Sequence, residues 1–166
     1  MNNIELIEFT ELVNKKILKD KIHSSALTWI DTPYHHQAKL KEVGVDCVNL
    51  IIAIGQEVGL IDHIELAPYN LQWHIHSKEE ILLHNLEKHG CIKLNVDLDK
   101  PETWPSFSII ALQYGRACSH LALLLPNQQV IHAAIDFGKV VMHDLSSEFI
   151  NRTRALYQYP NYETNI

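Results

Sequence analysis

The sequence has little of what marks a membrane-spanning, nucleic-acid-binding or disulfide-rich protein. No stretch approaches the roughly 20 apolar residues that a membrane-spanning helix requires. The chain carries 14 Lys and Arg against 20 Asp and Glu, and this net charge of −6 argues against nucleic acid or an anionic membrane as partner. Three cysteines, Cys47, Cys91 and Cys118, contain no Cys-x-x-Cys pair. We therefore expect no disulfide framework and look for a free functional thiol.

The N-terminus also lacks a basic stretch followed by an apolar run, so the sequence predicts no secretory signal and synthesis in the cytosol. Apolar residues make up 46% of the 166 residues and charged residues 20%, which is ordinary for a globular protein. No internal repeat, low-complexity tract or linker interrupts the chain. We expect one globular unit, with a helical extension over residues 1–25 and the main domain over 26–166.

Helical patterns precede strand patterns along the chain. The spacing of apolar residues predicts helices over 4–19, 21–30, 47–58 and 77–90, the last one begun by a capping box of Ser77 and Glu80. Alternation and turn residues predict strands over 107–114, 119–125, 129–135, 139–144 and 155–159. This order predicts an α+β domain in which N-terminal helices pack on an antiparallel sheet.

Cys47 lies where a polar loop gives way to the start of a helix. Unpaired N–H groups and the helix dipole stabilise a thiolate at such a place, and they can lower a thiol pKa to about 3.5–7.5. We expect Asp46 to be the N-cap of this helix. The alternative is that Cys47 is a structural cysteine that faces the core.

Two histidines interrupt apolar strand patterns, His120 before a run of leucines and His132 inside Val130–Ala134. A hairpin at Pro126-Asn127 would place both at the same end of neighbouring strands, and an odd-length loop or a bulge would place them on one face. With Cys47 they would form a nucleophile, a base and a group that orients the base. The alternative for each histidine is an ordinary core or surface residue.

Three segments resemble the NlpC family of papain-like cysteine peptidases, most closely its branch from phage tail gene clusters. They are Trp-Ile-Asp-Thr-Pro-Tyr-His-His-Gln at 29–37 with Gly-Val-Asp-Cys-Val-Asn-Leu at 44–50, Tyr-Gly-Arg at 114–116 with Ser-His-Leu-Ala-Leu at 119–123, and Val-Ile-His-Ala at 130–133. The resemblance spans about residues 26–160. The sequence departs from the family at Ala38 and Asn49, where glycine is usual. It also has Pro-Ser-Phe at 105–107, where family members often have Pro-Gly-Asp before the first strand of the catalytic sheet.

The resemblance implies a papain-like fold with Cys47 as nucleophile, His120 as base and His132 as the residue that orients it. It also implies that Tyr34 lies beside the nucleophile and helps to bind the substrate or the oxyanion. We expect Asp46 to belong, with Tyr34, to the residues that bind the substrate or the oxyanion. The backbone N–H of Cys47 would donate to the oxyanion.

The activity implied is cleavage of the amide bond between γ-D-glutamate and a diamino acid in peptidoglycan stem peptides, after delivery to the cell wall with a phage tail. Phage tail proteins are the expected protein partners. Acyl transfer or another amidase reaction on the same residues, and a non-enzymatic tail or interaction protein, remain alternatives. We expect no cofactor and no metal, because His74, His76, His84, His89 and Cys91 match no standard zinc spacing.

Overall fold

A computed structural model of the chain describes residues 2–163. Its helices are α1 (Asn3–Leu27), α2 (Cys47–Glu57), α3 (Trp73–His76), α4 (Ile81–Lys88) and α5 (Ser147–Arg152). Two 3₁₀ turns lie at Pro101–Thr103 and Pro126–Gln128. The strands are β1 (Lys39–Leu40), β2 (Gly44–Val45), β3 (Ile92–Lys93), β4 (Ile109–Gln113), β5 (Cys118–Leu125), β6 (Gln129–Ala134), β7 (Lys139–Asp144) and β8 (Thr153–Gln158).

The main sheet has six strands in the order β3-β8-β4-β5-β6-β7, and every neighbouring pair is antiparallel. β1 and β2 form a separate two-stranded ribbon just before α2. Consecutive strands β4 to β7 are neighbours in the sheet, so short turns connect them. The expected α+β domain, with helices first and an antiparallel sheet afterwards, is confirmed.

Apolar side chains cover both faces of this sheet. One face packs against α2 and the end of α1, through residues such as Leu50, Ile54 and Leu123. The other face packs against α5, where Phe149 contacts the side of the sheet that bears Leu112 and Val130. Side chains alternate between the faces along β4 and β5, which explains why these strands carry long apolar runs instead of apolar-polar alternation.

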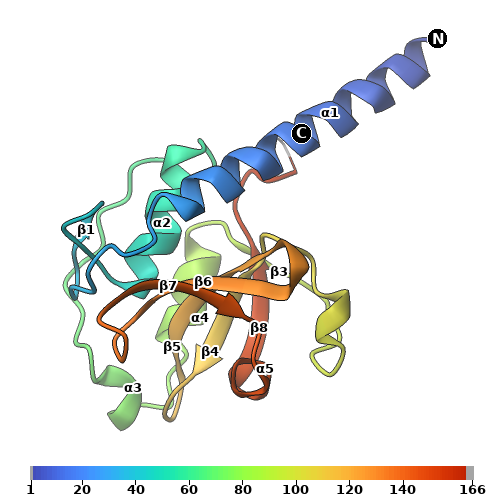
Figure 1. Cartoon of the computed structure of the whole chain (residues 1–166). Coiled ribbons are helices and arrows are strands. Elements are labelled where there is room, and N and C mark those ends of the chain that lie inside the picture. Colours follow the sequence, from blue (N-terminus) through green and yellow to red (C-terminus); the bar gives the residue numbers. More distant parts are fainter. Residues whose placement is uncertain (1, 164–166) are drawn as a thin grey trace.

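The helix α1 is one continuous helix and not the two helices predicted over 4–19 and 21–30. Its cap is a capping box in which the Asn2 side chain accepts from the Glu5 backbone and the Glu5 carboxylate accepts from the Asn2 backbone. Only its last turns enter the core, through Leu18, Ile22 and Ala26, and the rest projects from the body (Figure 1). The predicted division at residue 25 therefore falls inside α1 and stays a prediction.

The predicted capping box at Ser77 and Glu80 is also wrong. The helix α4 begins at Ile81, and no side chain caps its first turn. The Glu80 carboxylate instead accepts a 3.0 Å hydrogen bond from the backbone N–H of Cys118 on β5. A contact distant in the sequence has replaced the local one. Among the residues that the structure describes, no helix combines the length and the hydropathy needed to span a bilayer.

Candidate active site

The thiol of Cys47 stands at the first position of α2, as predicted. Asp46 caps the helix, and its Oδ1 accepts a 2.9 Å hydrogen bond from the backbone N–H of Asn49. The apolar run that follows packs Leu50 and Ile54 against the sheet and so fixes the helix over β5. This packing holds Cys47 in a buried position, with 8% of the residue exposed.

The Asp46 carboxylate connects the loops around Cys47. Its Oδ2 accepts a 2.7 Å hydrogen bond from the backbone N–H of Gln37 and another from the hydroxyl of Tyr69. His36 lies nearby, with Nδ1 3.8 Å from the same oxygen and Nε2 2.9 Å from the carbonyl oxygen of Tyr69. Both Asp46 oxygens therefore have partners within the protein, and its predicted role in substrate binding stays a prediction.

Tyr69 could not be predicted from the sequence, because residues 61–76 have no periodic pattern. Burial raises the pKa of Tyr69 well above its usual range, and the hydrogen bond that its hydroxyl donates to Asp46 adds to the effect. Tyr34 pairs with Val45 beside α2. Burial raises the pKa of Tyr34 above its usual range, and the nearby charges of Cys47 and Asp46 add to the effect. Tyr34 therefore lies within electrostatic range of Cys47.

The predicted lowering of the Cys47 pKa is wrong for this structure. Burial, the largest cause, and the negative charge of Asp46 together raise the pKa of the thiol to about 12. Backbone hydrogen bonds at Leu121, Val48 and Cys47 itself act in the opposite direction but are outweighed. The helix N-terminus does favour the thiolate here, yet the loss of water around the sulfur is the larger effect. The resting protein holds a neutral thiol.

His120 on β5 and His132 on β6 lie side by side, as the sequence predicts. Their rings meet through His120 Nε2 and His132 Nδ1 at 2.8 Å. The three-residue turn Pro126–Gln128 joins the strands, and its odd length puts the two side chains on the same face of the sheet. His132 is 5% exposed and His120 is partly buried. Burial lowers the pKa of His120 to about 4 and that of His132 to about 2, so both rings are neutral at pH 7.

The structure adds His143 on β7 to this pair. Its Nε2 lies 3.0 Å from Nε2 of His132, and its Nδ1 lies 2.8 Å from the carbonyl oxygen of Asp144. Phe149 of α5 packs against the rings of both His132 and His143. His143 lies in a polar stretch of alternating exposure, so the sequence could have shown it only through the pairing of β6 with β7.

Cys47 lies against β5, the strand that carries His120. The Cys47 sulfur lies against the backbone of Leu121, the residue that follows His120. Within residues 2–163, no hydrogen bond joins this sulfur to His120 or His132. The two halves of the predicted triad are thus brought to adjacent residues of one strand, and their direct contact stays a prediction.

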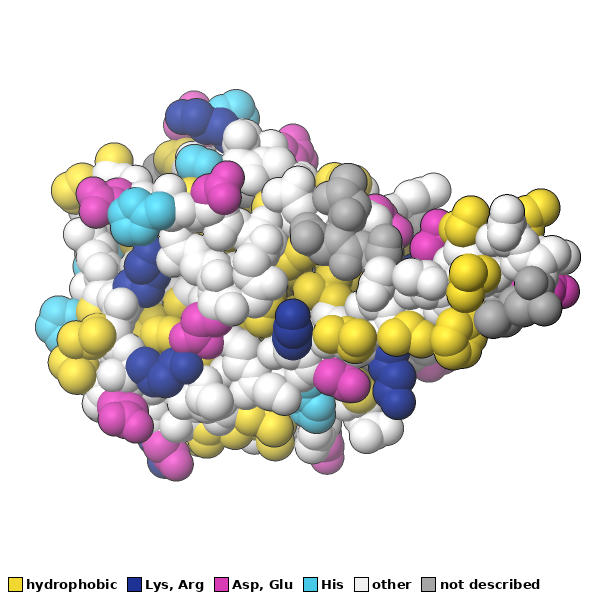
Figure 2. Space-filling model, turned by 90° about the horizontal axis from the view of Figure 1, so that it is seen from above, with side chains coloured by type: hydrophobic (Ala, Val, Ile, Leu, Met, Phe, Trp, Pro, Cys, Tyr) yellow, Lys and Arg dark blue, Asp and Glu magenta, His cyan; other side chains and the backbone are white. Residues whose placement is uncertain are grey.

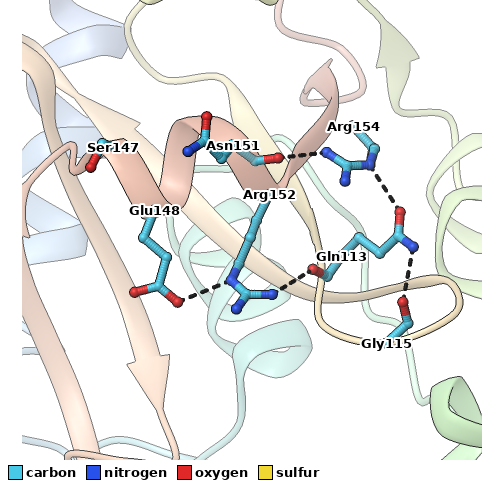
Figure 3. A pocket seen from close by; sticks show the side chains of 7 residues that line it. All are labelled: Gln113, Gly115, Ser147, Glu148, Asn151, Arg152 and Arg154. Carbon is cyan, nitrogen blue, oxygen red and sulfur yellow. Dashed lines mark hydrogen bonds and ion pairs between the residues drawn. The ribbon is translucent and has the colours of Figure 1, made fainter.

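A polar hollow of about 570 Å³ opens between the end of β4, the helix α5 and the start of β8 (Figure 3). Tyr114 connects it to the site, because its ring meets the His120 ring edge-on at 5.8 Å while the Arg152 guanidinium stacks 4.3 Å from the ring centroid. Arg152 also donates to the Glu148 carboxylate at 3.0 Å. The lining residues are Gln113, Gly115, Ser147, Glu148, Asn151, Arg152 and Arg154.

A cysteine that begins a buried helix over an antiparallel sheet, with histidines on the adjoining strands, defines the papain-like class of α+β folds. Within that class the chain has the fold of NlpC/P60 domains. It is similar to the NlpC/P60 domain of the peptidoglycan hydrolase SagA, with a TM-score of 0.56 and 17% identity over 84% of this chain and 97% of that one.

Two other solved structures share the fold. The peptidoglycan hydrolase RipB from Mycobacterium tuberculosis matches with a TM-score of 0.56 and 16% identity, over 88% of this chain and 66% of RipB. A lipoprotein-like NLP/P60 protein from Staphylococcus aureus matches with a TM-score of 0.57 and 17% identity, over 86% of this chain and 41% of the Staphylococcus aureus chain. No protein-family model and no curated protein matches the chain.

Proposed function

We propose that this protein is a cysteine peptidase that cleaves an amide bond in the stem peptides of bacterial peptidoglycan. The observation that carries the proposal is the convergence on β5 of a cysteine at a helix N-terminus and a hydrogen-bonded histidine pair. Two of the proteins that share the fold are described as peptidoglycan hydrolases. The finer assignment, to the bond between γ-D-glutamate and the diamino acid, rests on the resemblance of the three sequence segments to the NlpC family.

The protonation states favour general-base catalysis over a preformed ion pair. With a neutral thiol and a neutral imidazole at rest, the proton of Cys47 passes to His120 as the sulfur attacks the amide carbonyl carbon. The carbonyl oxygen becomes an oxyanion, to which the Cys47 backbone N–H donates. When the C–N bond breaks, His120 returns the proton to the leaving amine and a thioester remains. His120 then takes a proton from water, which hydrolyses the thioester and regenerates the thiol.

Delivery to the cell wall with a phage tail, in contact with tail proteins, is part of the same proposal and rests on the same resemblance. Mass spectrometry of purified phage particles tests it, because the chain should be found in the tail fraction. Absence from particles that carry the other tail proteins would contradict it.

The activity itself is tested by incubating purified muropeptides with the protein and analysing the products by mass spectrometry. The expected products carry a free γ-carboxyl group and a free amine on the diamino acid. Cys47→Ala should abolish cleavage, because no other residue forms the thioester, whereas Cys91→Ala is the matched control and should keep it. Intact muropeptides would contradict the proposal. A product in which the γ-carboxyl group is joined to an added amine, and is not a free acid, would show acyl transfer.

A further inference from the structure

The three histidines form a chain of hydrogen bonds that begins at a backbone carbonyl. Asp144 supplies this carbonyl oxygen, which lies 2.8 Å from Nδ1 of His143. The next contacts are His143 Nε2 to His132 Nε2 at 3.0 Å and His132 Nδ1 to His120 Nε2 at 2.8 Å. Each contact joins one donor to one acceptor, so the protonated nitrogen of each ring follows from its neighbour.

The carbonyl oxygen can only accept, so His143 must carry its proton on Nδ1. In the neutral ring, Nε2 of His143 is then an acceptor, and His132 must donate from its own Nε2. The neutral His132 ring therefore presents an acceptor at Nδ1, and His120 must donate from Nε2. This leaves the lone pair of His120 on Nδ1. Burial keeps the rings of His120 and His132 neutral, as this sequence of tautomers requires.

We infer that His143 is a positioning residue that sets the tautomer of His120 through His132. It acts on the base and touches neither the substrate nor the sulfur. The inference rests on the proposed function, in which His120 accepts the Cys47 proton at the nitrogen that this chain leaves free. Phe149 packs against His132 and His143 and holds both rings in place.

Nitrogen-15 NMR of the histidine rings tests the tautomers without any substrate. At pH 7 the wild-type protein should show a proton on Nε2 of His120, on Nε2 of His132 and on Nδ1 of His143. A proton on Nδ1 of His132 would overturn the inference. Since this readout is independent of turnover, correct tautomers in a protein that does not cleave muropeptides would count against the proposed function alone.

Two substitutions separate positioning from packing. His143→Leu removes the acceptor for His132, so we expect mixed tautomers at His120 and a fall in kcat of at least about tenfold, with KM little changed. His143→Gln offers a carbonyl oxygen to His132 and should restore most of the rate. His63→Leu, at a ring that is 77% exposed and pairs with Glu65, is the matched control. Equal loss in His143→Gln and His143→Leu, with tautomers unchanged in both, would show a structural role only.

A separate observation concerns the part of α1 that projects from the body. Its apolar side chains remain uncovered, and Figure 2 shows them along the projecting helix. Leu6, Phe9, Val13 and Ile17 are 50%, 56%, 39% and 47% exposed, and their spacing puts them along one side of the helix. We call these four residues the α1 stripe. Ile4 and Ile7 belong to a different side, which continues into the buried Leu18 and Ile22.

The charges beside the stripe change sign along the helix. The N-terminal half carries Glu5, Glu8 and Glu11, and the C-terminal half carries Lys15, Lys16 and Lys19. A second copy that packs antiparallel, centred near residue 11, brings Leu6 opposite Ile17 and Phe9 opposite Val13. Glu5 and Lys16 lie on the same flank of the stripe. Only the antiparallel arrangement places Glu5 of one copy beside Lys16 of the other. Opposed helix dipoles also favour this arrangement.

We further infer that the α1 stripe is an interface with a second copy of this chain, packed antiparallel. At the base of the stripe, Ile17 and Val58 line a surface hollow of about 580 Å³ between α1 and the end of α2. In the antiparallel arrangement this hollow lies next to the first turn of the partner helix. The α1 stripe thus continues onto the body of the protein beside the first turn of the partner's α1.

Light scattering on the full chain over a range of concentrations tests this inference, and a concentration-dependent dimer is expected. Phe9→Lys should shift the equilibrium to monomer, whereas Ile7→Lys, at an equally exposed residue outside the stripe (57%), should not. Lys16→Glu should weaken the dimer by opposing Glu5. Adding Glu5→Gln should restore part of the affinity, since glutamine keeps the capping box. A monomer at every concentration, binding to lipid vesicles instead, or no rescue by Glu5→Gln would overturn the inference.

Discussion

Burial controls the protonation of Cys47 and His120 more strongly than any charged partner does. The thiol and the imidazole both lose water in the fold, which raises the pKa of the acid and lowers that of the base. An ion pair is therefore disfavoured at rest, although the helix N-terminus favours the thiolate. Cys47 is therefore a neutral thiol at neutral pH.

Alkylation of Cys47 by iodoacetamide should therefore rise about tenfold per pH unit between pH 6 and pH 9, without reaching a plateau. The pKa near 12 lies above this whole range, so the thiolate fraction grows throughout. Mass spectrometry of the labelled peptide measures the rate. A plateau below pH 7 would instead indicate a preformed ion pair.

Asp46→Asn offers a matched variant for the same measurement. It keeps the acceptor oxygen that caps α2 and removes the negative charge that raises the pKa of Cys47. Its amide nitrogen replaces the oxygen that accepts from the Gln37 N–H and the Tyr69 hydroxyl, so the melting temperature is measured together with the alkylation rate. Alkylation at a fixed pH should be faster than in the wild type. A slower reaction would show that Asp46 lowers the pKa of the thiol, contrary to the charge argument.

At the scale of elements, local pattern located the strands better than the helices. The predicted strands at 119–125 and 139–144 are matched by β5 and β7 to within one residue, because turn residues bound long β-branched or apolar runs. The predicted start of a helix at Ser77 failed because Glu80 bonds to β5, a partner that no local pattern reveals. Tyr69 and His143 were missed for the same reason, since their roles come from contacts with Asp46 and His132.

The turn between β5 and β6 determines that His120 and His132 lie on the same face of the sheet. Its Asn127 and Gln128 have positive φ values of 61° and 58°, a conformation that asparagine tolerates and that glycine adopts freely. Deleting Asn127 leaves an even loop, which moves the side chains of β6 by one position and turns His132 to the other face of the sheet.

We expect this deletion to abolish muropeptide cleavage, while Asn127→Gly, which keeps the loop length, should retain it. Activity and the melting temperature of both variants, measured together, test the expectation. Full activity in the deletion variant would show that His132 need not share the face of His120.

For the molecule as a whole, the sequence predicted N-terminal helices packed on an antiparallel sheet, but neither α5 on the second face of the sheet nor how far the first helix extends. Continuous burial from α2 through the sheet to α5 follows from the apolar runs in the sequence. The projecting part of α1 has apolar residues at helical spacing just as a buried helix has, so pattern alone does not distinguish a helix that is packed from one that is exposed. Only the structure shows that the core ends near Leu18.

The buried histidines also make the stability of the whole protein depend on pH. His120 and His132 have pKa values of about 4 and about 2 in the folded state, below the 6.5 of an exposed histidine. Between pH 6.5 and pH 4 the unfolded chain binds protons at these rings that the folded chain does not, so the free energy of unfolding falls as the pH falls. Each such proton costs about 1.4 kcal/mol per pH unit, and the two rings contribute nearly equally down to about pH 4. Urea denaturation at pH 4.5 and pH 7 should show this loss, and His132→Gln should reduce the difference between the two pH values. An unchanged difference in His132→Gln would mean that His132 is protonated in the folded protein, which would contradict the neutral histidine chain on which the proposed mechanism depends.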